Sequence, residues 1–331
     1  MDMRRLAVRT DLALEAKEAA ARELGDAIPG VETESESLDG ITVTRIRVLD
    51  ERGAQTIGKQ VGHYVTLEVP GLRRKDSVLQ ENVSRVFAGE FEAFLSAIGT
   101  APDDKVLIVG LGNWNVTPDA LGPIVVENVL VTRHYFELMP ERVSPGYRQV
   151  SAVAPGVLGI TGIETSEIVQ GIVEKSKPDL VICIDALASR SIDRLNTTIQ
   201  IADTGIHPGS GIGNKRKGLN RETLGVPTVA IGVPTVVYAS TIVNNSIEMI
   251  MDHVRKQTNR TREIFGMMET LPENERLEFV REVLGPLGQD LLVTAKEIDE
   301  FIEDIANVIA TGLNIALHEA VRPDNAAVHT H

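Results

Sequence analysis

Leu180-Val181-Ile182-Cys183-Ile184-Asp185 is the stretch that decides the fold. Its five apolar residues are consecutive rather than alternating, which is typical of a strand covered by helices on both faces. Lys105–Val109 and Thr228–Gly232 have the same character, and segments with helical periodicity accompany the three runs: 122–139, 164–175 and 241–256. The sequence therefore predicts an α/β protein with a mostly parallel sheet.

The chain before residue 105 has a different character. Residues 11–24 are rich in Ala, Leu, Glu and Lys and are predicted to be helical, and residues 25–40 are predicted to be an acidic, turn-rich stretch. Ile41–Val48 alternates strictly between apolar and polar residues, and His63–Val69 resembles a second strand. We therefore expect a small antiparallel β addition over about residues 41–70.

Composition argues against several classes of function. The 331 residues are 43% hydrophobic, so the chain can bury a full core, while 33 basic and 47 acidic side chains leave a net charge of −14. This charge repels phosphate backbones, so no direct nucleic-acid binding is expected. No run approaches the roughly 20 apolar residues of a membrane helix, so no membrane association is expected. The single cysteine, Cys183, forms no internal disulfide and favours a reducing, intracellular compartment.

Two aspartates follow the predicted strands. Asp119 comes after the first run through a Gly- and Asn-rich loop, and Asp185 directly follows the second. Loops at the carboxyl ends of parallel strands form the sites of open α/β sheets, so the two carboxylates are candidates for a shared catalytic crevice. Like charges at close range share a proton, which suits acid-base cleavage of a peptide bond. The structural alternative is that Asp119 caps a helix beginning at residue 120 and that Asp185 pairs with Arg190 or Arg194.

The Gly-rich stretches do not indicate a nucleotide site. Gly110-Leu111-Gly112-Asn113 lacks a third glycine and no helix follows at once, and His207–Lys217 lacks the spacing of a phosphate-binding loop. We therefore expect no cofactor. His207 is the strongest histidine candidate for the site, but a single histidine is a weak signal for metal binding, and no metal site is assigned.

Four stretches, in order along the chain, resemble the germination proteases of endospore-forming bacteria: Arg9–Ala13, Gly110–Pro123, Ile184–Ser191 and Asp203–Arg216. The stretch from Gly110 to Asp119 is also similar to the hydrogenase-maturation peptidases. The resemblance implies a three-layer α/β/α sandwich and a catalytic pair at Asp119 and Asp185. It also implies an endopeptidase, made as a zymogen, that degrades small acid-soluble spore proteins in the forespore and spore core, and a homotetramer.

Thr10-Asp11-Leu12-Ala13-Leu14-Glu15 is similar to the sites at which family substrates are cut, which run Thr-Glu, then Ile or Phe, then Ala-Ser-Glu. By this resemblance we expect self-cleavage between Asp11 and Leu12, with residues 1–11 as a propeptide. The protease domain then spans 12–331, with a C-terminal helical segment at about 273–320 broken near Gly285-Pro286.

The acids around the predicted cut suggest that cations line the cleft. The candidates are Lys215, Arg216 and Lys217, and Asn113 is a further candidate for the lining. Two positions depart from the family pattern: Tyr238 stands where members tend to carry Asp, and residues 253–265 are shorter than in the family. A metal-dependent peptidase with Asp119, Asp185 and His207 around an ion is the alternative mechanism. A non-enzymatic metal or ligand carrier is the alternative function.

Overall fold

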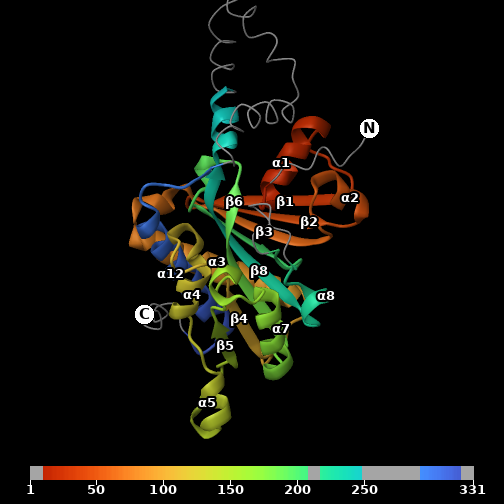
Figure 1. The fold of residues 1–331 in the computed structure, drawn as a ribbon. Coiled ribbons are helices and arrows are strands. Elements are labelled where there is room, and N and C mark those ends of the chain that lie inside the picture. Colours follow the sequence, from red (N-terminus) through yellow and green to blue (C-terminus); the bar gives the residue numbers. More distant parts are fainter. Residues whose placement is uncertain (1–9, 208–216, 248–290, 322–331) are drawn as a thin grey trace, which may run out of the picture.

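A single nine-stranded sheet organises the chain (Figure 1), in a computed structural model that describes residues 10–207, 217–247 and 291–321. The predicted apolar runs form β4 (Val106–Gly110), β6 (Leu180–Ser189) and β8 (Thr228–Tyr238), and β5 (Val150–Val153) joins them. All four run parallel, in the order β8-β6-β4-β5. The predicted α/β class with parallel central strands is confirmed.

The predicted antiparallel addition is continuous with this sheet. It contains β2 (Ile41–Val48) and β3 (Gly62–Glu68), which pair antiparallel. The link is a strand that was not predicted, β7 (Thr198–Ala202), which pairs antiparallel with both β3 and β8. A two-residue strand, β9 (Leu292–Val293), pairs with the end of β8.

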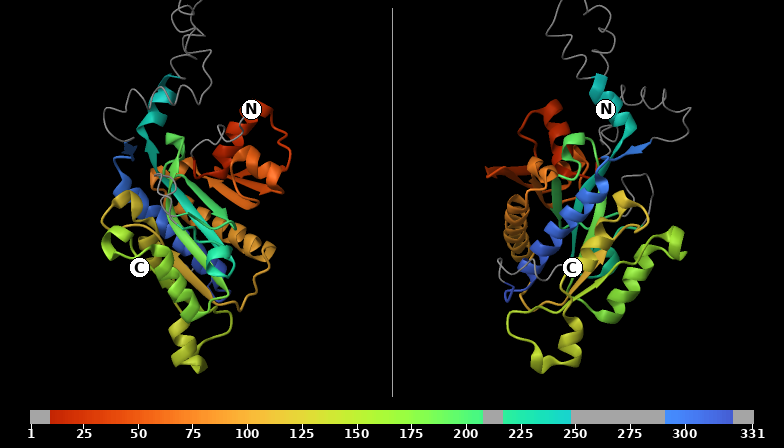
Figure 2. Two further views of the ribbon diagram at one scale, coloured as in Figure 1. Left: turned by 45° about the vertical axis from the view of Figure 1, so that its right-hand side comes forward. Right: turned by 90° about the vertical axis from the view of Figure 1, so that its left-hand side faces the viewer.

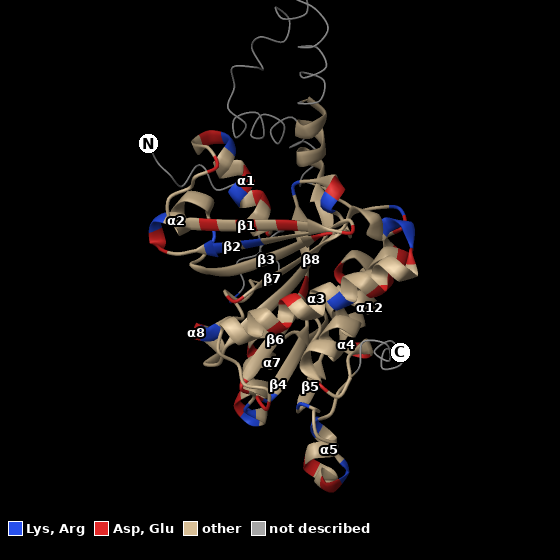
Figure 3. Cartoon of the chain, turned by 180° about the vertical axis from the view of Figure 1, so that it is seen from behind, with Lys and Arg blue, Asp and Glu red and all other residues tan. Residues whose placement is uncertain are grey.

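The expectation of turns over residues 25–40 was wrong for most of that stretch. Val31–Leu38 forms the edge strand β1, paired with all of β2. It escaped notice because almost every residue of β1 is exposed, so no apolar alternation exists. Cross-strand ion pairs take the place of a buried face: Arg45 to Glu36 at 2.6 Å and Arg47 to Glu32 at 3.2 Å. Figure 3 shows these charges along β1 and β2.

Helices cover both faces of the sheet, as the three-layer architecture requires. One face carries α3 (Ser77–Ala97), α4 (Leu121–Asn128) and α12 (Ile298–Leu317), which Figure 3 shows in front of the strands. The other carries α7 (Thr165–Ser176) and α8 (Arg221–Leu224), with α1 (Ala13–Leu24) and α2 (Glu51–Ile57) over β2 and β3 (Figure 2). Alternate residues of β6 face opposite layers: Ile182 packs in the cluster that contains the side chains of α3 and α12, and Cys183 packs with those of α7.

The other predicted helices are confirmed in part. The segment 122–139 contains two helices, α4 and α5 (Arg133–Leu138), and 164–175 is α7. Residues 239–247 are helical, and the rest of 241–256 lies outside the described residues. The segment 273–320 is not one helical unit, because β9 precedes α12; its first part, with Gly285-Pro286, is outside the described residues. The remaining elements of the described residues are short: η2 (Pro70–Arg74), η3 (Thr117–Asp119), η4 (Pro140–Arg142), α6 (Leu158–Thr161) and η5 (Ile192–Arg194). Across the described ranges, no helix is both long enough and apolar enough to cross a membrane.

Candidate active site

The site lies where the connections of two neighbouring strands diverge. The chain leaves β4 for α4 on one face and returns to β6 from α7 on the other, and such a switch point opens a crevice at the carboxyl ends of the strands. Asp185 lies one residue beyond the last pair that β6 makes with β4 and is 6% exposed. By strand alternation its side chain shares a face with those of Cys183 and Leu187. Asp119, half-buried, ends η3 in the loop from β4 to α4.

Tight backbone contacts fix the loop that carries Asp119. Gly112 has a φ of +117°, and a Cβ there would lie 1.9 Å from the carbonyl oxygen of Asp119. That oxygen accepts from the Asn113 N–H at 3.0 Å, and the Thr235 hydroxyl donates to the Pro118 carbonyl at 2.6 Å. The glycine in this motif therefore allows the loop to fold back on itself, which positions Asp119.

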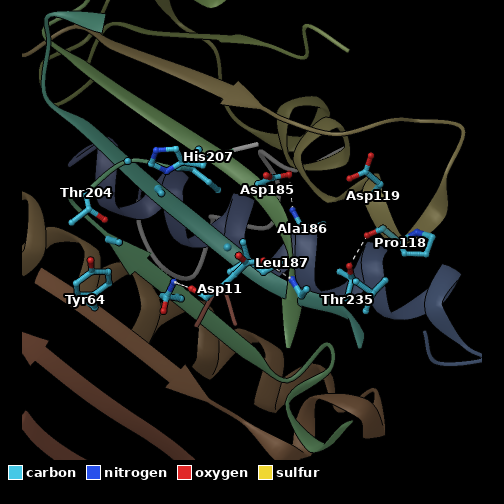
Figure 4. A pocket seen from close by; sticks show the side chains of 18 of the residues that line it. Asp11, Tyr64, Pro118, Asp119, Asp185, Ala186, Leu187, Thr204, His207 and Thr235 are labelled. Atoms are coloured by element: carbon cyan, nitrogen blue, oxygen red, sulfur yellow. Dashed lines mark hydrogen bonds between the residues drawn. The ribbon is translucent and has the colours of Figure 1, made fainter. Parts of the chain in front are cut away.

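Asp119 and Asp185 line one cavity of about 610 Å³ (Figure 4). Figure 4 shows Asp185 on β6 and Asp119 on the neighbouring loop, with Asp11 in the same cavity. His207 also lines it and is exposed. The cavity thus brings the two predicted catalytic carboxylates together with the predicted cleavage position.

The segment around Asp11 is held by main-chain contacts to β6. The Asp11 N–H donates to the Ala188 carbonyl at 3.3 Å, and the Ala188 N–H donates to the Asp11 carboxylate at 2.9 Å. Leu12, fully buried, packs in the cluster of apolar side chains that includes Val109 and Leu187. Asp11, the acidic residue before the predicted cut, therefore lines the cavity, and Leu12, the apolar residue after it, is buried beside it.

Two side chains bracket the Asp11–Leu12 peptide bond. Lys59 Nζ donates to the carbonyl oxygens of Thr10 at 2.8 Å and Asp11 at 2.9 Å. Gln200 Nε2 donates to the Asp11 carbonyl at 3.3 Å, and its Oε1 accepts from the Ala13 N–H at 2.6 Å. Desolvation of the amine lowers the pKa of Lys59, and the negative charges of Asp11 and Glu15 oppose that shift.

Glu15 occupies a pocket for a carboxylate at the first turn of α1. It is 4% exposed and accepts from the Ser189 hydroxyl at 2.8 Å and from the N–H groups of Arg190 at 2.9 Å and Ser191 at 3.1 Å. Arg194 Nη1 lies 3.5 Å away, and the Thr10 hydroxyl also donates to this carboxylate. Glu15, the fourth residue after the predicted cut, is therefore matched by donors at the end of β6 and on the two residues that follow it.

The structure places two cations near the acids that were not among those predicted to line the cleft. Lys215 and Arg216 lie outside the described residues, and Lys217 is exposed. Lys59 and Arg194 take this role, and neither belongs to a motif that sequence reasoning could have recognised. Asn113 organises the loop instead, because its side-chain oxygen accepts from the Asn115 N–H at 3.0 Å.

Two of the structural roles considered for the aspartates are not supported, and the pairing of Asp185 with Arg190 stays an alternative. Helix α4 has Ala120 as its N-cap and no side-chain cap, so Asp119 does not cap it. Arg194 forms ion pairs with Glu15, Glu18 and Glu68, so it is committed to other carboxylates. Within the described ranges, no three His, Cys, Asp or Glu side chains are grouped as metal ligands.

Comparisons with known proteins agree on one family. A family model described as "Germination protease" matches residues 7–262 and 257–330, and the junction of the two matches falls within residues 253–265, where the chain was expected to be shorter. Proteins named "Germination protease" from Bacillus cereus and Bacillus anthracis are each 50% identical over 100% of this chain and 99% of their own length. One from Halalkalibacterium halodurans is 48% identical over 98% of this chain and 97% of its own. The chain therefore belongs to the germination protease family of peptidases.

Proposed function

We propose that this chain is an endopeptidase zymogen that cleaves itself between Asp11 and Leu12 by means of Asp119 and Asp185. One observation carries the proposal: Asp11, the residue before the predicted cut, lines the same cavity as both carboxylates. It is bound there by β6, β7 and the loop after α2, which are segments remote in sequence. Residues 1–11 are then the propeptide, and residues 12–331 the protease domain.

A proton shared by the two carboxylates would drive the cleavage. The ionised member takes a proton from water as the water oxygen attacks the Asp11 carbonyl carbon. The protonated member gives its proton to the Leu12 nitrogen as the C–N bond breaks. A pair that must hold one proton becomes competent in mild acid, so this chemistry makes the self-cleavage acid-dependent.

Family membership supports the wider role. The substrates are small acid-soluble spore proteins, cut during germination in the forespore and spore core, and the enzyme is a homotetramer. Light scattering on the purified chain tests the assembly, and a fourfold monomer mass is expected. Incubation of the processed enzyme with a small acid-soluble spore protein tests the substrate.

Intact mass after a shift to mildly acidic pH tests the self-cleavage. The wild type should lose residues 1–11, and Asp119→Asn and Asp185→Asn should stay whole. Asp39→Asn is the matched control, because Asp39 is an exposed aspartate in the β1–β2 turn, and it should be processed like the wild type. Cleavage in both site variants would refute the carboxylate pair, and inhibition by a chelator would favour the metal-dependent alternative instead.

A further inference from the structure

We propose that Lys59 and Gln200 are catalytic residues that stabilise the negative charge developing on the carbonyl oxygen of the scissile bond. The proposal rests on the self-cleavage between Asp11 and Leu12 proposed above. In this proposal the carboxylates transfer protons, and Lys59 and Gln200 stabilise the oxyanion.

The geometry around the Asp11 carbonyl carries this inference. Lys59 comes from the loop after α2 and Gln200 from β7, and both donate to the same oxygen, at 2.9 and 3.3 Å. Gln200 also accepts from the Ala13 N–H at 2.6 Å, so it spans the bond to be cut. Both side chains line the cavity that contains Asp119 and Asp185. Two donors that converge on one carbonyl are the arrangement by which acyl-transfer enzymes bind a tetrahedral oxyanion.

The placement of Lys59 is costly without such a role. Its amine end is desolvated among carbonyl oxygens, and this burial lowers its pKa. A lysine that only covered apolar surface would extend its amine into water. Here the stem leads the amine inward onto Thr10 and Asp11.

The donors act at one defined step. When water adds to the Asp11 carbonyl carbon, the C=O π pair moves onto oxygen, and the N–H groups of Lys59 and Gln200 receive that charge. The pair returns when the C–N bond breaks, and the Leu12 nitrogen leaves with a proton from the carboxyl pair. The products are a carboxylic acid at Asp11 and an amine at Leu12, and neither donor is consumed.

The test compares the rate of self-cleavage with how firmly the segment around Asp11 and Leu12 is bound before the cut. Full-length Lys59→Met and Lys59→Arg are followed by intact mass in mild acid, and hydrogen exchange of the Leu12 and Ala13 amides at neutral pH reports the ground state. Lys175→Met, an exposed lysine on α7, is the control and should be processed at the wild-type rate. We expect Lys59→Met to be slower by about 10²–10³-fold, the loss typical of removing one oxyanion donor, with exchange unchanged. The Arg variant should regain at least part of the rate.

Two results would overturn the proposal. An unchanged rate in Lys59→Met would do so, and so would a loss of exchange protection that matches the loss of rate, because Lys59 would then only seat the segment. If Lys59→Met does not fold, Gln200→Leu is judged by the same two measurements. Failure of the wild type to cut between Asp11 and Leu12 would instead refute the proposed function.

Discussion

Glu15 and Glu18 offer a matched test of what holds the first turn of α1 in place. Both carboxylates pair with Arg194, but the Glu15 side chain is 3% exposed and that of Glu18 is 41% exposed. Glu15 also accepts from two backbone N–H groups and two hydroxyls, whereas Glu18 accepts from the guanidinium of Arg194. Replacing each by alanine separates the buried acceptor from the ion pair.

The expected costs differ several-fold. Each buried donor left without an acceptor costs about 1–3 kcal/mol, and breaking a buried ion pair costs about 3–5 kcal/mol. Arg194 keeps Glu68 and Glu18 after the loss of Glu15, so the cost of Glu15→Ala falls at the lower end, about 3 kcal/mol. Arg194 is largely buried but Glu18 is exposed, and pairs with exposed carboxylates contribute little, about 0.2–1 kcal/mol, so Glu18→Ala should cost about 1 kcal/mol or less.

Urea unfolding of the full-length chain at neutral pH, followed by circular dichroism, measures both free energies of unfolding. Glu15→Gln should fall between the two alanine variants, because the amide keeps one acceptor oxygen and its shape. Equal losses for Glu15→Ala and Glu18→Ala would refute the reasoning, since they would make the Arg194 ion pair, and not the buried acceptor, the source of stability.

Three further outcomes follow from burial and backbone geometry. Burial raises the pKa of the Cys183 thiol, so the folded protein should resist a thiol reagent at pH 8 and react once unfolded; rapid labelling of the native protein would contradict this. Gly112→Ala should abolish self-cleavage because its Cβ would displace Asp119. Gly171→Ala, at an exposed helix position with open space, should leave cleavage intact and raise the free energy of unfolding by up to about 1 kcal/mol. Intact mass measures the cleavage, and urea unfolding measures the stability. Burial lowers the pKa of Lys59 below 10.5, so the unfolded chain binds that proton more tightly than the folded chain. The free energy of unfolding of the wild type, relative to that of Lys59→Met, should therefore rise as the pH approaches 10.5. A fall would contradict the burial of the amine.

The central sheet could be predicted because its strands are covered on both sides. Leu180–Ile184 has no polar position that contacts solvent, so its pattern alone specifies a central strand. Strand β1 is the opposite case, since an exposed edge strand has no apolar pattern at all. The short strand β9 was missed because its pairing depends on β8, not on its own two residues.

The residues of the candidate site also differ in whether the sequence could predict them. Asp119 and Asp185 were accessible to sequence reasoning because strand order alone brings strand ends together. Lys59 and Gln200 were not, because nothing local marks them. They become neighbours only when β3 pairs with β7, which brings segments about 140 residues apart to one carbonyl oxygen.

The burial of Leu12 has a consequence for what happens after the chain is cut. Hydrolysis before this residue would create an α-ammonium group, with an ordinary pKa near 8, on the main-chain nitrogen of a residue that has no exposed surface. Holding a new cation there costs several kcal/mol unless a carboxylate pairs with it. If the proposed cleavage takes place, the new terminus therefore either moves into solvent, which leaves the site open to another polypeptide, or pairs with Asp119 and Asp185 and changes the charge of that pair.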